Sequence, residues 1–320
     1  MVFTLKIVQR LYHKFLLIRE LEEEIVKRYN MGKMRCPTHL SIGQEGIAVA
    51  FSEIVKKKDF AISTHRPHAH YIAKGGNINK LIAELYGKKT GCSNGIGGSM
   101  HLIDLKVNFM GSSSILGNSI PIGVGLGFSS KINKVNNISF IFLGDGATEQ
   151  GVFYESVNFS VIKKIPVIFI CENNKYSVYS DLKPRQPLNR KIYKLTNSLG
   201  IKSFYSNGKN LFEMIKILKA SEKYVKKNRK PCFVEIDTFR WYEHCGVNKD
   251  DNLNYRSKKE LDKWVQKDHL KFLEKKLALK KNLIDKIKKK VHLEVQKAFN
   301  FAEKSKFPKN SDLFKGVYEK

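Results

Sequence analysis

The stretch from residue 138 to residue 171 restricts the possible folds of this chain more than any other segment. Ile138–Leu143 is a short, largely apolar run, which is typical of a buried strand. Glu149–Lys163 then carries apolar residues at helical spacing, and after Pro166 a second apolar run covers Val167–Cys171. A helix of this length allows the right-handed crossover that joins parallel strands. The segment therefore predicts a strand–helix–strand unit within a parallel sheet.

The rest of the chain continues the alternation of strands and helices. A strand predicted at 60–64 precedes helices at 77–87 and 119–131, and a strand at 232–239 follows a helix at 211–227. The other predicted elements are an N-terminal helix at about 4–30, a helix at 43–57, a glycine-rich loop at 87–98, a mobile loop at 241–256 and a basic helical region at about 258–306. Such alternation is typical of α/β proteins. We predict a mostly parallel, doubly wound sheet flanked by helices, in a single domain spanning residues 1–320.

The net charge of +28 is the most unusual feature of the composition. One interpretation is a surface for nucleic acid or for an acidic protein. The alternative is a lysine-rich chain whose charges lie on solvated helix faces. Because the lysines are dispersed and no nucleic-acid-binding motif accompanies them, we expect no nucleic-acid function. An acidic partner protein stays open.

Segments that would direct the chain to a membrane or to secretion are not evident. No apolar run approaches the roughly 18 residues of a membrane-spanning helix, and the N-terminal residues lack the apolar core of a signal peptide. The five cysteines are widely spaced and form no Cys-x-x-Cys pair, which is typical of a reducing compartment. We expect a cytoplasmic protein that does not associate with membranes.

Polar residues follow both strands of the central unit. Gly144–Gly146, with the sequence Gly-Asp-Gly, comes directly after the first strand, and Asn173–Asn174 follows the second. In a parallel sheet both segments lie at the carboxyl ends of strands, where open α/β sheets bind ligands. Asp145 and Asn174 offer the oxygen ligands that Mg²⁺ prefers, and the glycines allow close backbone approach to a diphosphate. Either motif alone could be an ordinary turn, but the two together at this spacing indicate a site for a magnesium-bound diphosphate.

These motifs resemble those of the alpha subunits of thiamine-diphosphate-dependent 2-oxo acid dehydrogenases, which include pyruvate, branched-chain and acetoin dehydrogenase alpha subunits. Gly144–Gly151 and Cys171–Tyr176 carry most of the resemblance. It extends in the family's order from about residue 5 to 265, through His39–Glu45, Thr64–His68, Gly97–His101, Gly117–Pro121, Arg240–Gly246 and Tyr255–Arg256. The resemblance implies the diphosphate-binding half of a thiamine-diphosphate-binding fold, with thiamine diphosphate and Mg²⁺ as cofactors.

The resemblance also implies which residues hold the metal and the diphosphate. Asp145, Asn174 and the backbone carbonyl of Tyr176 would ligate Mg²⁺. Gly146 and Ala147 would contact the diphosphate through their backbone.

Four further residues match family positions around the cofactor. Arg66 would pair with the diphosphate, because a guanidinium matches phosphate geometry. His65 stands where many relatives have tyrosine, and it could still donate to a phosphate. Leu116 would be the apolar wedge that bends the cofactor, and Ser114 would lie near its aminopyrimidine ring.

Two histidines match catalytic positions of the family. His39 would lie on the substrate side. His244, on the predicted mobile loop, would reach toward the diphosphate and the incoming acyl acceptor. Either could instead be structural, as a lone histidine usually is. The loop also departs from the family's Tyr-His-Gly-His-Ser pattern in Trp241–Cys245, which leaves the substrate open. Cys245 replaces a serine that some relatives phosphorylate, so we expect that regulation to be absent at this position.

The implied activity requires a second polypeptide. The family places the glutamate that activates the cofactor on a beta subunit, and we find no candidate for it in the motifs of this chain. We therefore expect an α2β2 heterotetramer that decarboxylates a 2-oxo acid such as pyruvate and passes the acyl group to lipoamide on a lipoyl acyltransferase core. The alternatives are an acetoin-type or biosynthetic relative that cleaves another ketone, and a non-catalytic regulatory subunit.

Gly123, Gly125 and Gly127 imitate a dinucleotide-binding fingerprint. They follow Pro121 in a helix-like stretch and do not close a strand. We interpret them as a site of close helix packing.

Overall fold

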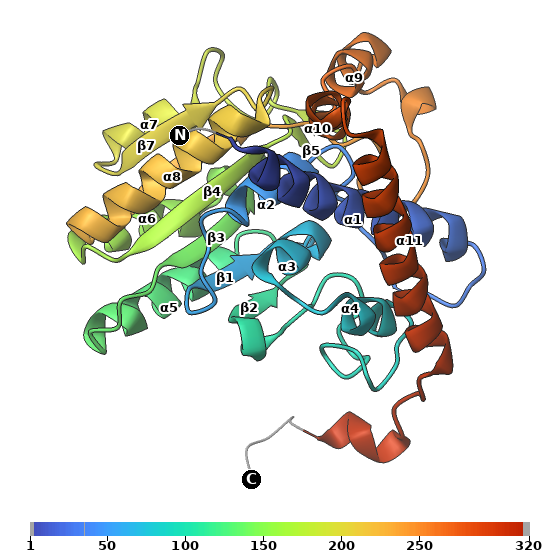
Figure 1. Ribbon diagram of the computed structural model, residues 1–320. Helices are drawn as coiled ribbons and strands as arrows, with labels where there is room; N and C mark the ends of the chain where they lie inside the picture. Colours follow the sequence, from blue (N-terminus) through green and yellow to red (C-terminus); the bar gives the residue numbers. More distant parts are fainter. Residues whose placement is uncertain (1–2, 35, 316–320) are drawn as a thin grey trace.

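The computed structural model describes residues 3–34 and 36–315, and a six-stranded parallel sheet forms its centre (Figure 1). The strand order is β2-β1-β3-β4-β8-β7. The strands are β1 (Phe60–Ser63), β2 (Phe109–Ser112), β3 (Ser139–Gly144), β4 (Val167–Asn173), β7 (Lys202–Ser206) and β8 (Cys232–Asp237). A small antiparallel pair, β5 (Tyr176–Ser177) and β6 (Ser180–Asp181), stands apart from it. The predicted doubly wound α/β fold is confirmed.

The central strands are buried on both faces, which explains why β3 and β4 are continuous apolar runs. Alternate side chains enter two different hydrophobic clusters. Phe140, Phe142, Ile168 and Ile170 belong to the larger cluster, and Ile141, Leu143, Val167 and Phe169 belong to the smaller one.

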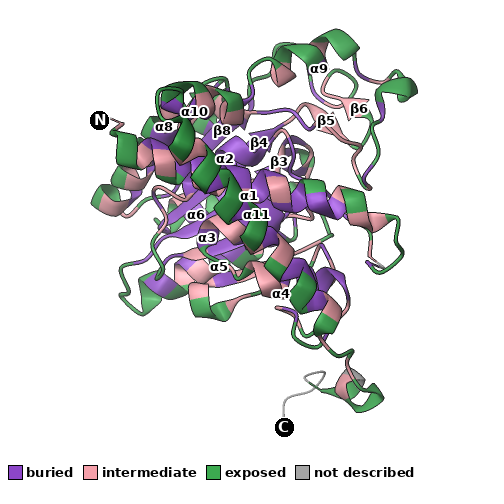
Figure 2. Cartoon of the chain, turned by 45° about the vertical axis from the view of Figure 1, so that its right-hand side comes forward, coloured by how far each residue is buried: buried purple, intermediate pink, exposed green. Residues whose placement is uncertain are grey.

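Helices cover both faces of the sheet, as a doubly wound fold requires. The larger cluster contains residues of α1 (Leu5–Tyr29), α2 (Glu45–Phe51), α3 (His68–Lys74), α4 (Ile78–Leu85), α8 (Leu211–Asn228), α10 (His269–Leu277) and α11 (Lys281–Lys304). The smaller cluster contains residues of α5 (Ser119–Ile132), α6 (Gly151–Ile162) and α7 (Ile192–Ser198). Figure 2 shows the buried residues concentrated around β3, β4 and β8, with exposed residues on the outer sides of the helices.

Helix α5 packs unusually close to the sheet through two of its glycines. A Cβ atom at Gly123 would lie 2.4 Å from Cγ1 of Ile141, and one at Gly127 would lie 2.4 Å from Cγ1 of Val167. Gly125, on the exposed side, has nothing within 4 Å of that position. The interpretation as close helix packing is confirmed for Gly123 and Gly127 and is wrong for Gly125.

Two predicted helical regions differ from the structure in extent. The helix expected at 43–57 covers only Glu45–Phe51, because the backbone changes to turn-type hydrogen bonds at Glu53 and Ile54. Asp59 then accepts a hydrogen bond from the backbone N–H of Lys56, just before β1. The basic region at 258–306 is helical, but it divides into α9 (Lys258–Val265), α10 and α11. Elements α3, α7, β2 and β7 were not predicted. Among the helices within the described ranges, none is long and apolar enough to cross a membrane.

Candidate active site

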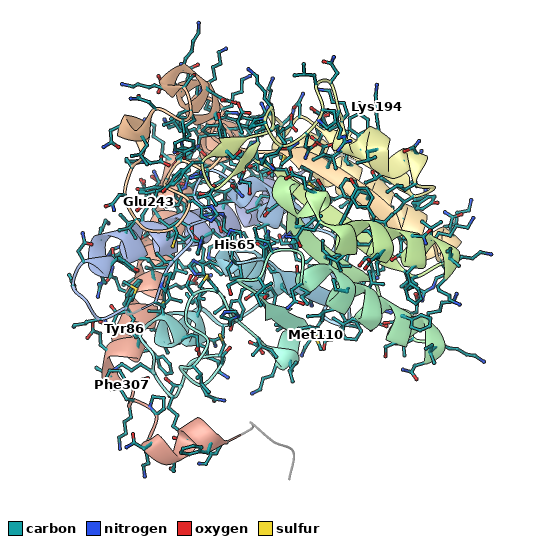
Figure 3. The ribbon with its side chains drawn as sticks, turned by 180° about the vertical axis from the view of Figure 1, so that it is seen from behind. His65, Tyr86, Met110, Lys194, Glu243 and Phe307 are labelled. Carbon is teal, nitrogen blue, oxygen red and sulfur yellow. The ribbon has the colours of Figure 1, made fainter. Side chains whose placement is uncertain are left out.

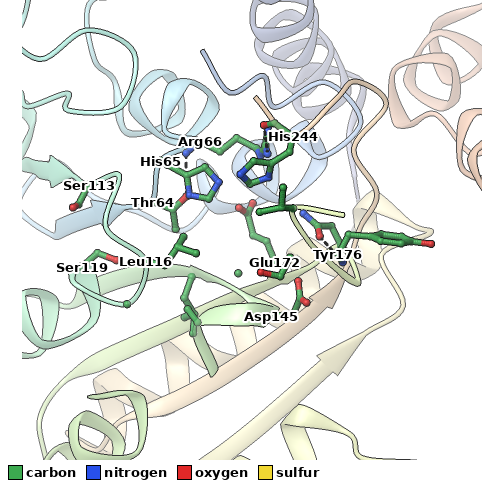
Figure 4. Close-up of a pocket in the computed structure, with 18 of the residues that line it drawn as sticks. Thr64, His65, Arg66, Ser113, Leu116, Ser119, Asp145, Glu172, Tyr176 and His244 are labelled. Carbon is green, nitrogen blue, oxygen red and sulfur yellow. Dashed lines mark hydrogen bonds between the residues drawn. The ribbon is translucent and has the colours of Figure 1, made fainter. Parts of the chain in front are cut away.

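A cleft lies at the carboxyl ends of β1, β3 and β4. It lies where the strand order reverses, since the chain runs outward from β1 to β2 and then returns to β3 on the other side of β1. This switch point is the usual ligand site of an open α/β sheet. Predicted site residues that line the cleft are His65, Arg66, Leu116, Asp145, Gly146, Ala147, Asn174, Tyr176 and His244. Figure 4 shows His65, Arg66 and His244 on one side of the cleft and Asp145 on the other.

The Asp145 carboxylate is buried and forms an ion pair with the guanidinium of Arg185. Gly144 pairs with Glu172, so Asp145 and Asn174 leave neighbouring strands at the same edge. The Oδ2 atom of Asp145 accepts a hydrogen bond of 2.6 Å from Nη2 of Arg185, whose Nη1 atom binds Glu149. Burial raises the pKa of Asp145, and the Arg185 guanidinium opposes that shift.

The amide of Asn174 is fixed from both sides. Its Nδ2 atom donates to Oε1 of Gln44 at 3.0 Å, and its Oδ1 atom accepts from the backbone N–H of Tyr176 at 3.0 Å. The side-chain oxygen is therefore oriented by the chain itself. Gln44, which the sequence analysis missed, lines the same cleft.

Arg66 joins the cleft to the loop that carries His244. Its side chain is buried, and it donates to the carbonyl oxygens of Leu40 and His244, the latter at 3.2 Å. Burial and the nearby charge of Arg240 lower the pKa of Arg66 to about 10, so the guanidinium stays charged at neutral pH.

Three histidines meet beside Arg66. The ring of His39 lies 4.7 Å from that of His65 and 5.1 Å from that of His244, between centroids. Burial, reinforced by the Arg66 charge, lowers the pKa of His39 and of His65 to about 2 and that of His244 to about 4. All three imidazoles are therefore neutral at neutral pH.

The loop at 241–256 is irregular, as predicted, and Asp250 anchors it. The Asp250 carboxylate accepts hydrogen bonds from Arg240, Arg256 and Tyr255. The loop also pairs with the segment that carries His39, because the backbone N–H of Gly246 donates to the carbonyl of Thr38 at 2.8 Å. Its predicted mobility stays a prediction.

Two predicted site residues do not line the cleft. Ser114 is exposed, although its neighbours Ser113 and Ile115 are part of the wall. His39 is buried and contacts the rings of His65 and His244.

Besides Gln44, the sequence analysis overlooked Glu172 and Arg185, which also belong to the site. Glu172 lines the cleft and binds Nε2 of His70 at 3.0 Å, while Nδ1 of His70 lies 2.8 Å from Oγ of Ser63. In the sequence, Glu172 stands directly before Asn173 and Asn174, and this position could have indicated it as a site residue. Arg185 lies in an irregular segment and follows no motif, so its contact with Asp145 had no signal in the sequence.

An all-parallel doubly wound sheet with a polar cleft at its switch point defines an α/β ligand-binding protein. Residues 13–311 match the dehydrogenase E1 component family, and the chain belongs to that family. Its side chains are drawn in Figure 3, where His65 of the cleft lies near the middle of the view and Lys194 and Phe307 lie toward its edges.

Individual relatives agree with this family. The chain is 37% identical to the pyruvate dehydrogenase E1 component subunit alpha of Rickettsia bellii, over 96% of this chain and 94% of the relative. It is 31% identical to the chloroplastic subunit alpha-3 of Arabidopsis thaliana, over 96% of this chain and 73% of the relative. It is also 31% identical to the alpha subunit of acetoin:2,6-dichlorophenolindophenol oxidoreductase of Bacillus subtilis, over 96% and 92%. The family predicted from the motifs, and an oxidoreductase subunit of the alpha type, are confirmed.

Proposed function

We propose that this chain is the alpha subunit of a pyruvate dehydrogenase-like enzyme that binds thiamine diphosphate and Mg²⁺ in the cleft. The observation that carries the proposal is the convergence of Asp145 and Asn174 at adjacent strand ends, opposite Arg66 and His244. The relatives named as pyruvate dehydrogenase subunits, which match nearly the whole chain, support pyruvate as the substrate. We further propose that the whole chain acts as one domain.

The residues of the cleft fit a magnesium-bound diphosphate. The buried Asp145 carboxylate requires a cation, and a guanidinium occupies that role in this structure. Together with the oriented Asn174 oxygen and the carbonyl of Tyr176, it offers the hard oxygen ligands that Mg²⁺ prefers. A Cβ atom at Gly146 would lie 3.0 Å from Oγ of Ser177, so glycine lets these two segments of the cleft wall pack closely.

Each of the following cleft residues then has its own role. Asp145 and Asn174 hold Mg²⁺, and Arg66 balances the remaining diphosphate charge. Leu116, which is 38% exposed and lines the cleft, would offer an apolar surface to the cofactor. Bound thiamine diphosphate would supply the electron sink for decarboxylation. His244, neutral at its position above the cleft, would accept or donate a proton during acyl transfer.

The proposed site is completed by other proteins. A beta subunit would supply the glutamate that activates the cofactor, in an α2β2 heterotetramer, and a lipoyl acyltransferase core would take the acyl group. We place the enzyme in the cytoplasm, and the five cysteines, all free thiols, support a reducing compartment.

Calorimetric titration with thiamine diphosphate tests the metal assignment. Asp145→Ala and Asn174→Ala should each abolish the Mg²⁺-dependent part of binding, because each removes a metal ligand. Asn189→Ala, at an exposed position outside the cleft, is the control and should bind as the parent does. Unchanged affinity in Asp145→Ala would refute the assignment.

An acetoin-type activity is the second candidate. The altered loop at Trp241–Cys245 and the relative named as an acetoin:2,6-dichlorophenolindophenol oxidoreductase subunit favour it. Turnover of the reconstituted enzyme with pyruvate and with acetoin separates the two. The pyruvate proposal fails if only acetoin is consumed.

A further inference from the structure

The glycine-rich loop at 87–98 forms one wall of a second cavity, which is separate from the cleft. The other walls come from the segment after α1 and from the C-terminal ends of α4 and α11. Within the described part of the chain, no residue lines both the cavity and the cleft. Figure 3 shows Tyr86 and Phe307, which line the cavity, below His65 of the cleft. The cavity volume of about 870 Å³ is within the range of small-molecule sites.

Glu84, at the end of α4, holds the glycine-rich loop in place. Its carboxylate is buried and accepts four backbone hydrogen bonds of 2.7–3.2 Å from the loop. The donors are the N–H groups of Ser93, Gly95, Gly97 and Gly98. Both oxygens of this carboxylate are therefore occupied by the protein itself.

Lys88 is a buried lysine that lines the cavity without a counter-ion. Only 8% of its surface is exposed. Among residues 3–34 and 36–315, its ammonium group has no ion-pair or hydrogen-bond partner, and its contact is with the ring of Phe307, 3.6 Å from the centroid. Glu303, the other acidic residue of the wall, is already paired with Lys33 at 2.7 Å. Because lysines are almost never this buried unless they are paired, the cavity offers a place for an anion.

The rest of the wall is suited to an apolar group. Ile96 and Phe307 line the cavity with 66% and 65% of their surfaces exposed. Exposed apolar residues that gather at a cavity are typical of binding sites. Tyr86 adds a buried hydroxyl that makes no hydrogen bond, although the charges of Arg28 and Glu303 act on it. This hydroxyl could donate to or accept from a polar group of a ligand.

We infer that the cavity binds a small organic anion, with its carboxylate at Lys88 and an aromatic or branched apolar body against Ile96 and Phe307. The ligand would give the buried ammonium group a counter-ion, in a position sheltered from water where charge-assisted hydrogen bonds are strong. It would also remove exposed apolar surface from water. The net charge of +28 favours the approach of anions. This site lies outside the cleft and does not depend on the proposed function.

Phenylacetate is a suitable probe because it joins a carboxylate to one aromatic ring. Its affinity for the full-length chain is measured by calorimetry and by ligand-observed NMR. Phenylacetamide keeps the ring without the charge, and acetate keeps the charge without the ring. We expect one phenylacetate per chain. Each of the two matched compounds should bind about 10-fold more weakly or worse, because each lacks one of the two interactions.

Substitution of Lys88 tests the position of the carboxylate. Lys88→Met should weaken phenylacetate binding by about 10-fold or more, since it removes the charge and keeps the apolar stem of the side chain. Lys88→Arg keeps a cation and should retain most of the affinity. Lys194→Met, at an exposed position outside the cavity, is the matched control and should bind as the parent does. Thermal unfolding of each variant ensures that a loss of binding is scored only for folded protein.

A titration in saturating Mg²⁺ and thiamine diphosphate separates the cavity from the cleft. The affinity for phenylacetate should stay the same, because the two sites share no lining residue. Displacement of phenylacetate by the cofactor would place the probe in the cleft and overturn the proposal. A chain that binds phenylacetate at Lys88 but fails to bind thiamine diphosphate would refute only the proposed function.

Four further outcomes would overturn the anion site. Phenylacetate could fail to bind at millimolar concentration, or it could bind Lys88→Met as tightly as the parent. Phenylacetamide could bind as tightly as phenylacetate, which would leave no role for the charge. Displacement of phenylacetate by an added beta subunit would make the cavity a contact between subunits.

Discussion

The Nη2 atom of Arg185 lies 2.6 Å from Oδ2 of Asp145, the carboxylate that we propose as a magnesium ligand. Both side chains are largely buried, with 11% and 2% of their surface exposed. A guanidinium thus neutralises the carboxylate in the free chain. When Mg²⁺ binds, Arg185 must share Asp145 with the metal or release it.

Replacing Arg185 should therefore lower the free energy of unfolding more in the cofactor-free chain than in the chain with Mg²⁺ and thiamine diphosphate bound. In Arg185→Met the buried carboxylate loses its counter-charge, which typically costs about 3–5 kcal/mol. Mg²⁺ with thiamine diphosphate would restore a positive charge and recover much of that loss. Urea unfolding with and without both cofactors measures the difference, and Arg190→Met at an exposed position is the control. An equal loss in both states would contradict the competition between Arg185 and the metal.

The close packing of α5 predicts opposite effects of two similar substitutions. Gly123→Ala should destabilise the chain by about 1–3 kcal/mol, because the new methyl group would overlap Ile141. Gly125→Ala, in the same helix but facing open space, should be neutral or stabilise it by up to about 1 kcal/mol. Chemical denaturation of both variants checks this. If the two behaved alike, the close contact between α5 and β3 would be wrong.

The three neutral histidines predict a loss of stability in mild acid. The pKa of His65 is about 2 in the folded chain and about 6.5 when unfolded. The unfolded state therefore takes up a proton first as the pH falls. The contribution of each neutral histidine to the free energy of unfolding is fully present above about pH 6.5. Below that pH it declines by up to about 1.4 kcal/mol per pH unit.

A variant isolates this contribution. Between about pH 6.5 and about pH 4, the unfolding free energy of His65→Gln should decline less steeply with falling pH than that of the parent. The difference in slope should correspond to the uptake of close to one proton on unfolding. The comparison of the two proteins cancels carboxyl groups whose pKa is raised by burial, such as Asp145. Identical slopes would mean that His65 is not held neutral in the folded chain.

His244 should matter for acyl transfer and not for cofactor binding. His244→Ala should bind thiamine diphosphate with an affinity near that of the parent. It should acylate a lipoyl domain about 10²–10⁴-fold more slowly, the usual contribution of a general acid or base. Decarboxylation with an artificial electron acceptor, measured in parallel, separates the two steps. Acylation at the parental rate would exclude this role.

Dependence on a beta subunit is open to a direct assay. The purified chain should show no decarboxylase turnover, because we propose that a partner supplies the activating glutamate. Addition of the beta subunit should establish activity. Robust turnover by the chain alone would contradict the divided site, and Glu172 would then be the first carboxylate to replace, since it lines the cleft.

Much of the fold and the site was predictable from local patterns. The strands and helix between residues 138 and 171 were recognised because apolar runs and helical periodicity are visible in the sequence. The ends of the helices and strands were harder to predict from the sequence. The helix at 43–57 ended early because the backbone changes to turn-type hydrogen bonds at Glu53 and Ile54, and β7, with only one fully buried side chain, has no strong apolar pattern.

The sequence by itself determined the metal and diphosphate candidates, because Asp145 and Asn174 directly follow two predicted strands whose carboxyl ends lie at the same edge of a parallel sheet. It also determined the family, through motifs spread along the chain. Only the tertiary structure decided that Arg185 neutralises Asp145 and that His39, His65 and His244 meet around one point. Such contacts join segments separated by tens to hundreds of residues, and they depend on how irregular loops pack rather than on any periodicity in the sequence.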